Sequence, residues 1–172
     1  LQSAGVMRFV WNWALRIEMD AFENGEKFIS AKKLKHMIVV LKKSDPNFAF
    51  LNSVSCHIPK AAIDNLIASF DKYFKEQKKP NYVRFTQRQI EHAARVGKKL
   101  TIYDSQYHPK FKSRKNTDFS FFVDGYDLQI HDNVVNIPKI GDVRCRKRHR
   151  GKSEPNIPEK LKGKSITFCK PK

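Results

Sequence analysis

Cysteine is scarce in this chain, and its three copies lie far apart. Cys56, Cys145 and Cys169 include no CxxC pair, so neither a disulfide framework nor a zinc ribbon is predicted. This usage fits a reducing compartment, and we expect a cytoplasmic location. No metal site and no cofactor are predicted.

Long hydrophobic runs are also missing. The longest, such as Met37 to Leu41, are far too short to cross a bilayer, and we expect no secretory leader. Hydrophobic residues nevertheless make up 40% of the 172 residues. That share can build the core of one medium domain or two small lobes, which argues against disorder throughout.

Acidic residues are half as frequent as basic ones. Asp and Glu number 17 against 34 Lys and Arg, which gives a net charge of +17. Such an excess repels itself unless a polyanion neutralises it. Nucleic acid is the partner that we favour, with an anionic membrane surface or an acidic protein as alternatives.

The few carboxylates show no catalytic arrangement. Metal-dependent phosphodiester cleavage needs two or three carboxylates that converge on divalent cations. Asp64 and Asp71 lie in a predicted helix rich in lysine, with no acidic strand beside them, and the six histidines have no triad spacing. We therefore expect this chain to be noncatalytic.

Helical periodicity dominates the first half of the sequence. Apolar residues from Val6 predict a helix that ends at Asn24-Gly25, and Ser30 is expected to cap a second helix that ends in Lys42 and Lys43. A third helix is predicted from about Ser55 to Gln77, and a fourth from Gln87 to Leu100. The stripe expected on the third helix comprises Ile58, Ala62, Ile63, Leu66, Phe70, Tyr73 and Phe74.

Beyond Asp118 the apolar period changes to two, which predicts strands. The alternating residues are Phe119/Phe121, Leu128/Ile130, Val135/Ile137 and Val143/Cys145, with a last strand over Ser165 to Lys170 and turns at Asp132-Asn133 and Gly141-Asp142. The predicted fold class is α+β: a three-helix, helix-turn-helix-like bundle, then an antiparallel β portion. We divide the chain into residues 1–79, a basic connector over 80–108, and residues 109–172.

The segment MRFVWNWAL, Met7 to Leu15, resembles the signature near the start of TnpB/OrfB proteins, the transposon-encoded relatives of type V CRISPR effectors. Further blocks follow in that family's order: a glycine turn, a helix ending in VVLKK, a helix closing with SFDKYFK, then PKFKSRK, then LQIHDNVVNIPKIGDVR. The link between Phe74 and Pro109 is longer than is usual in the family, which leaves the path of RNA past Asn81 to Gln106 open.

The resemblance implies a fold and a function. Residues 1–79 would form a helical recognition lobe, and residues 109–172 an incomplete β-barrel-like wedge domain. Together they would hold a guide RNA and the duplex DNA beside the target, in a prokaryotic cell. Cleavage would belong to a RuvC-type nuclease half of the full-length protein, which we expect to be absent from this chain.

Two basic runs are the predicted phosphate contacts. They comprise Lys110, Lys112, Arg114 and Lys115, and Arg144, Arg146, Lys147, Arg148 and Arg150. The alternative is a solvated surface that only improves solubility. Phe111 could stack on a base, but we favour a core anchor.

The turn that opens the third predicted helix is the candidate contact for target-flanking DNA. By resemblance its residues are Cys56, His57 and Lys60, with Lys35 as a neighbour. The alternatives are buried packing and, least favoured, a metal pair at Cys56 and His57. One turn apart on the first helix, Arg8 and Asn12 could hold a phosphate, but a structural role is favoured.

Three functions compete. The leading one is the nucleic-acid-recognition part of an RNA-guided transposon endonuclease. The second is a stand-alone helix-turn-helix DNA-binding transposon protein, which would need no RNA. The third is a basic protein on an anionic membrane surface; it leaves the β half unexplained, and the apolar helical faces are only as wide as core stripes.

Overall fold

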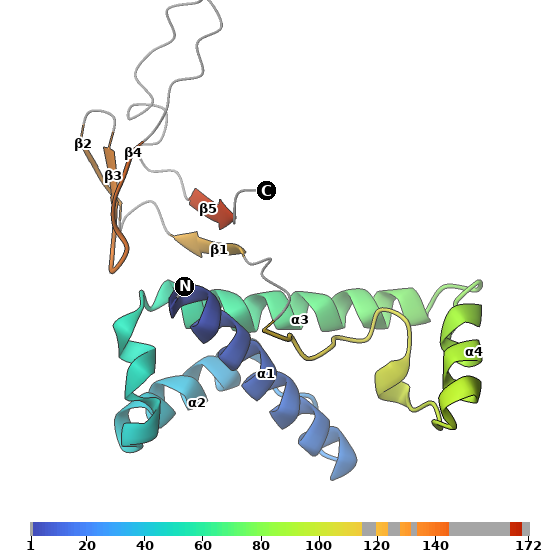
Figure 1. Ribbon diagram of the computed structural model, residues 1–172. Coiled ribbons are helices and arrows are strands. Elements are labelled where there is room, and N and C mark those ends of the chain that lie inside the picture. Colours follow the sequence, from blue (N-terminus) through green and yellow to red (C-terminus); the bar gives the residue numbers. More distant parts are fainter. Residues whose placement is uncertain (1, 115–119, 124–127, 132–133, 145–165, 170–172) are drawn as a thin grey trace, which may run out of the picture.

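The computed structural model describes residues 2–114, 120–123, 128–131, 134–144 and 166–169. Helices come first and antiparallel strands second (Figure 1), which confirms the α+β class. Three long helices build the bundle, and a short fourth helix stands beside the far end of the third. No helix of the described residues is long and apolar enough to cross a bilayer.

The first helix, α1 (Gln2–Glu23), supplies the centre of the core. Val10, Ala14 and Leu15 are fully buried at helical spacing. The helix ends at the predicted place, because Gly25 takes a left-handed φ of +72° that costs a glycine little.

The second helix, α2 (Ala31–Ser44), begins at the predicted cap, where Ser30 Oγ accepts a hydrogen bond of 3.4 Å from the Lys33 N–H. Its buried residues are Leu34 and Ile38. A 3₁₀ helix that the periodicity did not predict, η1 (Pro46–Ser53), follows directly.

The third helix, α3 (His57–Gln77), packs against both α1 and α2. Its stripe is buried as predicted from Ile58 to Tyr73. Phe74 is a correction, because 42% of this side chain is exposed. It stacks on Phe70 at the helix surface, with ring centroids 6.1 Å apart.

The fourth helix, α4 (Gln87–Val96), is shorter than predicted. A capping box between Thr86 and Gln89 starts it. Gly97 ends it with a left-handed φ of +66°, so the predicted extension to Leu100 is wrong. The short 3₁₀ helix η2 (Ile102–Asp104) comes next.

Residues 102–114, here called the return segment, run back along α1 and α3. Near one end, the Tyr103 hydroxyl donates a hydrogen bond of 2.9 Å to Glu23 Oε1. Further along, Trp11 Nε1 donates to the Lys110 carbonyl at 2.9 Å. Asn12 then holds the Lys112 backbone twice, since Oδ1 accepts from its N–H at 2.8 Å and Nδ2 donates to its carbonyl at 3.0 Å.

Five short strands form two antiparallel sheets, and no closed barrel forms among the described residues. Strand β1 (Ser120–Val123) pairs with β5 (Ile166–Cys169). Strands β2 (Gln129–His131), β3 (Val134–Ile137) and β4 (Gly141–Arg144) form the other sheet in that order. In the part of residues 109–172 that the structure describes, an open three-stranded sheet and a separate strand pair stand where a barrel-like wedge was predicted.

The predicted hairpin turn at Gly141-Asp142 is displaced. The turn occupies residues 138–140, where Lys139 has a φ of 65°, and Gly141 is the first residue of β4 with a φ of 92°. Asp142 pairs with Asn136 across the ladder, and the two side chains hydrogen-bond at 2.7 Å. The predicted Asp132-Asn133 turn, Phe119 and Cys145 lie outside the described residues.

One carboxyl group is buried inside the helical core. Glu18 is 4% exposed, and its Oε2 accepts a hydrogen bond of 3.1 Å from the Ile29 N–H. Its Oε1 has no hydrogen-bond partner among the described residues. Burial raises the pKa of Glu18 above its ordinary value of 4.5, against the smaller opposite effect of the Ile29 hydrogen bond.

We expect the Asn12→Ala variant to lose about 2 kcal/mol of unfolding free energy, because two hydrogen bonds to the Lys112 backbone disappear together. Urea unfolding measures the loss. The matched control is Asn65→Ala on the exposed face of α3, which should change the free energy by less than about 0.5 kcal/mol. Equal effects in the two variants would show that the hydrogen bonds between Asn12 and the Lys112 backbone do not stabilise the fold.

Glu18→Gln should stabilise the protein more at neutral than at acid pH. Because the pKa of Glu18 is higher in the folded than in the unfolded protein, the native state binds the proton more tightly. The stability that Glu18 contributes is therefore fully present below the pKa of the unfolded state, and it is lost as the pH rises through the pKa of the folded state. Glutamine keeps an acceptor for Ile29 and does not ionise. Thermal unfolding of both proteins at about pH 4 and about pH 7 tests this; a difference in melting temperature that is the same at both pH values would contradict it.

Candidate nucleic-acid interface

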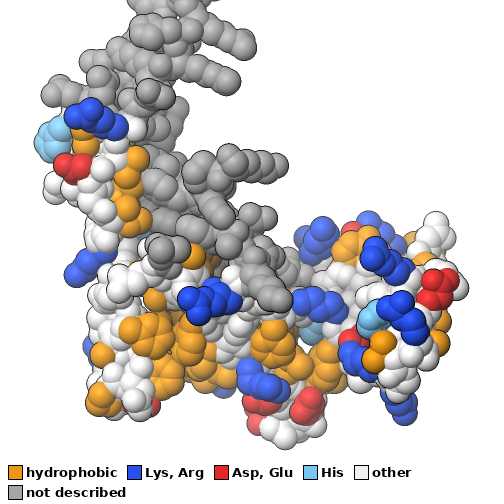
Figure 2. Space-filling model, in the orientation of Figure 1, with side chains coloured by type: hydrophobic (Ala, Val, Ile, Leu, Met, Phe, Trp, Pro, Cys, Tyr) orange, Lys and Arg blue, Asp and Glu red, His pale blue; other side chains and the backbone are white. Residues whose placement is uncertain are grey.

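Basic side chains are spread over the face seen in Figure 2, between apolar patches on the helices. Sequence alone does not show which of them are free to meet a phosphate. The hydrogen bonds and ring contacts of each predicted residue sort them into cations that serve the fold and cations that face solvent.

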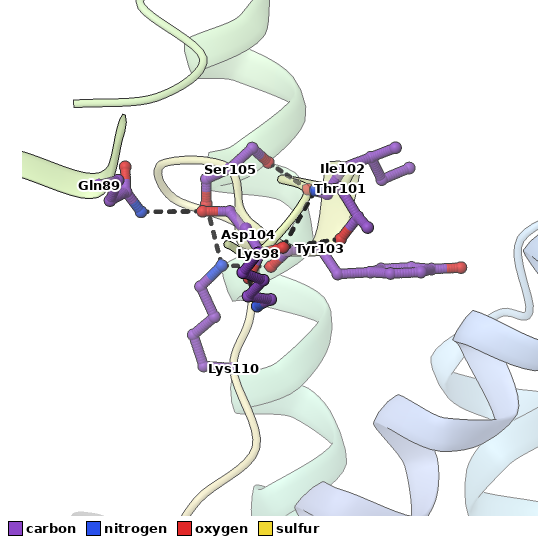
Figure 3. Close-up of polar contacts among 8 residues, drawn as sticks. All are labelled: Gln89, Lys98, Thr101, Ile102, Tyr103, Asp104, Ser105 and Lys110. Atoms are coloured by element: carbon purple, nitrogen blue, oxygen red, sulfur yellow. Dashed lines mark hydrogen bonds and ion pairs between the residues drawn. The ribbon is translucent and has the colours of Figure 1, made fainter. Parts of the chain in front are cut away.

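Lys110 is an exposed residue whose ammonium is nevertheless bound to the protein backbone. Its ammonium donates hydrogen bonds to the carbonyls of Tyr103 and Ser105, the latter at 3.1 Å (Figure 3). Burial of the ammonium lowers the pKa of Lys110. The same loop is tied to α4, because Gln89 Nε2 donates to the Asp104 carbonyl at 2.8 Å.

A carboxylate network holds this loop from the other side. Asp104 accepts hydrogen bonds from the Thr101 N–H at 3.0 Å and from Lys98 Nζ at 2.6 Å (Figure 3). The Lys98 hydrogen bond is the largest cause that lowers the pKa of Asp104 to about 2. The network orders the backbone whose carbonyls bind Lys110.

Lys112 is also engaged internally. Its ammonium lies 3.9 Å from the centroid of the buried Trp11 ring, a cation–π contact. Burial lowers the pKa of Lys112. Arg114, by contrast, is exposed, and Lys115 lies outside the described residues.

Phe111 is not the core anchor that we favoured. Its side chain is 47% exposed, and the Arg16 guanidinium lies 5.6 Å from its ring centroid. The ammonium groups of Lys110 and Lys112 contact the protein, whereas the Phe111 ring between them faces away. An exposed aromatic ring beside an arginine is typical of surfaces that stack nucleobases.

Arg16 was missed by the sequence analysis. The available signal was its position four residues after Asn12 and eight after Arg8, which places the three side chains along one face of α1. Asn12 on this face has the structural role that we favoured, although its partner is the Lys112 backbone rather than a helix end.

The candidate flank-binding residues lie on two packed helices. Lys35 on α2 forms an ion pair of 2.5 Å with Asp64 on α3. Lys60 is exposed one helical turn before Asp64, so Lys35 and Lys60 belong to one surface. Asp64 was not predicted there, and its charge partly neutralises that surface.

Cys56 and His57 open α3. Cys56 is exposed, which excludes buried packing for this residue, and His57 is half-buried. Among the described residues, no three His, Cys, Asp or Glu side chains gather as a metal site would require. The geometry thus leaves surface contact as the remaining prediction for Cys56.

The second basic run is represented by one described residue. Arg144 is exposed at the end of β4, opposite Val134 in the register. Arg146, Lys147, Arg148 and Arg150 lie outside the described residues, so their role stays a prediction.

Residues 1–27 match a family model that is described as a helix-turn-helix domain. The model is that of the OrfB proteins of the IS605 type, so residues 1–27 are similar to the N-terminal region of transposon-associated OrfB/TnpB proteins. The match covers α1 and the turn after it. No curated protein matches the chain.

Proposed function

We propose that this chain is the nucleic-acid-recognition part of a TnpB/OrfB-type RNA-guided endonuclease, binding a guide RNA and the duplex DNA that flanks the target. One observation carries the proposal: the helix matched by the helix-turn-helix family model is the helix that clamps the basic return segment. The net charge of +17 supplies the polyanion affinity.

The RNA-binding surface is formed by α1 and the return segment. Arg16 and Phe111 present a cation beside an exposed ring, and Arg114 continues the charge along the same segment. Stacking on the ring tolerates any base, while the arginines meet phosphates. Lys110 and Lys112 fix the segment in place and add to the local positive potential.

The DNA-binding surface is formed by α2 and α3. Helix-turn-helix proteins place one helix in the major groove and position it through backbone contacts. Lys35 and Lys60 share such a surface here, beside Cys56 at the start of α3. We assign the DNA flank to this face of the bundle.

We further propose that the chain itself is noncatalytic. Several acidic side chains make contacts within the protein, among them Asp64 with Lys35, Asp104 with Lys98, and Glu18 with the Ile29 N–H. Cleavage then depends on a RuvC-type nuclease half in the full-length protein.

Binding of RNA should be controlled by the exposed arginines. We expect about five to eight cations to neutralise phosphates. The logarithm of the binding affinity should then fall linearly with the logarithm of the salt concentration, with a slope of about −0.7 per contact for single-stranded nucleic acid. Arg114→Ala and Arg144→Ala should each weaken binding evenly across sequences and flatten the slope by about 0.7. We predict the same for Arg146→Ala and Arg148→Ala.

The control for this titration is Lys79→Ala, two residues beyond the end of α3, where Lys79 Nζ pairs with Glu76 at 2.8 Å. It makes the same change in net charge and should leave the slope unchanged. If all of the arginine variants behave like this control, their side chains are solvated surface and the RNA-binding proposal fails.

The second candidate, a DNA-binding protein that needs no RNA, is favoured by the helix-turn-helix match itself. Both functions predict that Lys60→Ala weakens duplex binding, and that Asp64→Asn strengthens it by releasing Lys35, each with a change of about 0.9 in the salt slope. Asp71→Asn, an exposed site later on the same helix, is the control. Unchanged duplex binding in both test variants would remove this face from the interface.

The two candidate functions are distinguished by repeating the duplex-DNA titration in the presence of RNA. Duplex binding that requires RNA supports the RNA-guided role, and sequence-specific duplex binding without RNA supports the stand-alone protein.

A further inference from the structure

The short helix α4 carries a row of cations that belongs to neither of the surfaces described above. Arg88, His92 and Arg95 are spaced by four and three residues, so at 3.6 residues per turn they lie along one face of the helix. All three are exposed, and they are here called the α4 stripe. Figure 2 shows Lys, Arg and His side chains gathered over this helix.

The arginines of the α4 stripe keep their charge available. Among the described residues, neither Arg88 nor Arg95 has an ion pair or a side-chain hydrogen bond. Glu91 lies within about one turn of both, yet its carboxylate accepts a hydrogen bond of 3.1 Å from Gln87. Two unpaired guanidiniums thus stand beside one carboxylate that a neutral side chain already engages.

A hollow of about 420 Å³ lies beside the stripe, and Arg88 and His92 line it. Other polar groups of its lining are occupied: Lys98 pairs with Asp104 at 2.6 Å, and Gln89 donates a hydrogen bond of 2.8 Å to the Asp104 carbonyl. Arg88 and His92 therefore remain to meet a ligand. A concave surface lined by unpaired cations concentrates the positive potential that attracts an anionic polymer.

The helix is held in a fixed place on the bundle. Where the chain leaves and rejoins the bundle, the Gln106 N–H donates to the Arg84 carbonyl at 2.8 Å. Tyr103 precedes Asp104, to which α4 is tied, and lines an aromatic pocket of about 370 Å³ where α1, the end of α3 and the return segment meet. Since the loop contacts both α4 and the bundle, a ligand of the stripe does not have to order the helix first.

The position of α4 favours RNA over duplex DNA. It stands beside the far end of α3 (Figure 1), a helix of 21 residues and therefore about 30 Å long. The face assigned to DNA, with Lys60, is at the start of α3. In contrast, the chain passes from α4 through η2 directly into the return segment, which carries Phe111 and Arg114. An RNA strand that follows the return segment reaches α4 at one end.

The apolar residues of α4 argue against a membrane surface. Ile90 and Val96 are exposed, but Ala93, which lies between them on the helix, is buried against the protein. A helix that lies in a membrane interface needs a continuous free apolar face, which α4 lacks.

We propose that the α4 stripe binds the phosphate backbone of RNA, as a third contact in addition to the two basic runs. The inference rests on the proposed RNA-binding function. Arg88 and Arg95 are seven residues apart, about 10 Å along the helix axis, so they can contact two different phosphates. Guanidinium groups match phosphate oxygens with paired N–H donors. The connector over residues 80–108 then carries part of the RNA path.

The test is a salt titration of single-stranded RNA binding by the 172-residue protein and by the double variant Arg88→Ala/Arg95→Ala. The variant should flatten the salt slope by about 1.4, which is two contacts at about 0.7 each, and bind at least about tenfold more weakly at about 50 mM salt. Its melting temperature should be unchanged, because alanine is the best helix former and neither arginine has a partner to lose.

Two further variants serve as controls. Lys27→Ala/Lys43→Ala removes the same two charges at exposed positions outside α4, and it should leave the slope unchanged. Arg88→Lys/Arg95→Lys keeps the charge of the stripe, and it should keep a slope close to that of the parent protein. A loss shared by the alanine variant and not by the lysine variant assigns the effect to the charge of the stripe.

The outcomes separate this inference from the proposed function. If the Arg88→Ala/Arg95→Ala variant behaves like the Lys27→Ala/Lys43→Ala control, the α4 assignment is overturned, even when Arg114→Ala weakens RNA binding. If the stripe variant weakens RNA binding and Arg114→Ala and Arg144→Ala do not, the proposed RNA surface is overturned instead. A loss confined to duplex DNA, or to vesicles that contain phosphatidylserine, overturns the assignment of the stripe to RNA.

Discussion

The clamp between α1 and the return segment is the interaction on which the rest of the structure depends. Trp11 and Asn12 bind backbone groups 99 and 100 residues later in the chain. The entropy that is lost when so long a loop closes must be offset by the contacts that closure allows. The clamp fixes Lys110 and Lys112 against α1 and directs Phe111 outward. It also positions Tyr103 and His108, which close the aromatic pocket.

The clamp divides the excess positive charge into two groups. Lys110 and Lys112 give up part of their hydration to carbonyls and to the Trp11 ring, and burial lowers the pKa of both ammonium groups. Arg16 and Arg114 keep exposed guanidiniums, whose planar geometry matches phosphate. A count of basic residues therefore overstates the number of available phosphate contacts.

Much of the fold could be predicted because its signals are local. Ser30, Gly25 and the periodicity of α1 to α3 each act over a few residues, and the structure bears them out. The Asn12 clamp and the Glu18–Ile29 hydrogen bond could not be predicted, because they join residues whose proximity depends on packing. Exposure of Phe74 and Phe111 also depends on distant neighbours, so their apolar character alone favoured burial.

The return segment links the pocket to the basic surface. His108 lines the pocket and lies two residues before Lys110, and its Nδ1 hydrogen-bonds the Pro109 carbonyl at 2.8 Å. Burial is the main cause that lowers the pKa of His108, and Nδ1 is the donor in this hydrogen bond because a carbonyl oxygen only accepts. The segment that lines the pocket through Tyr103 and His108 is therefore the same one that presents Phe111 and Arg114 at the surface.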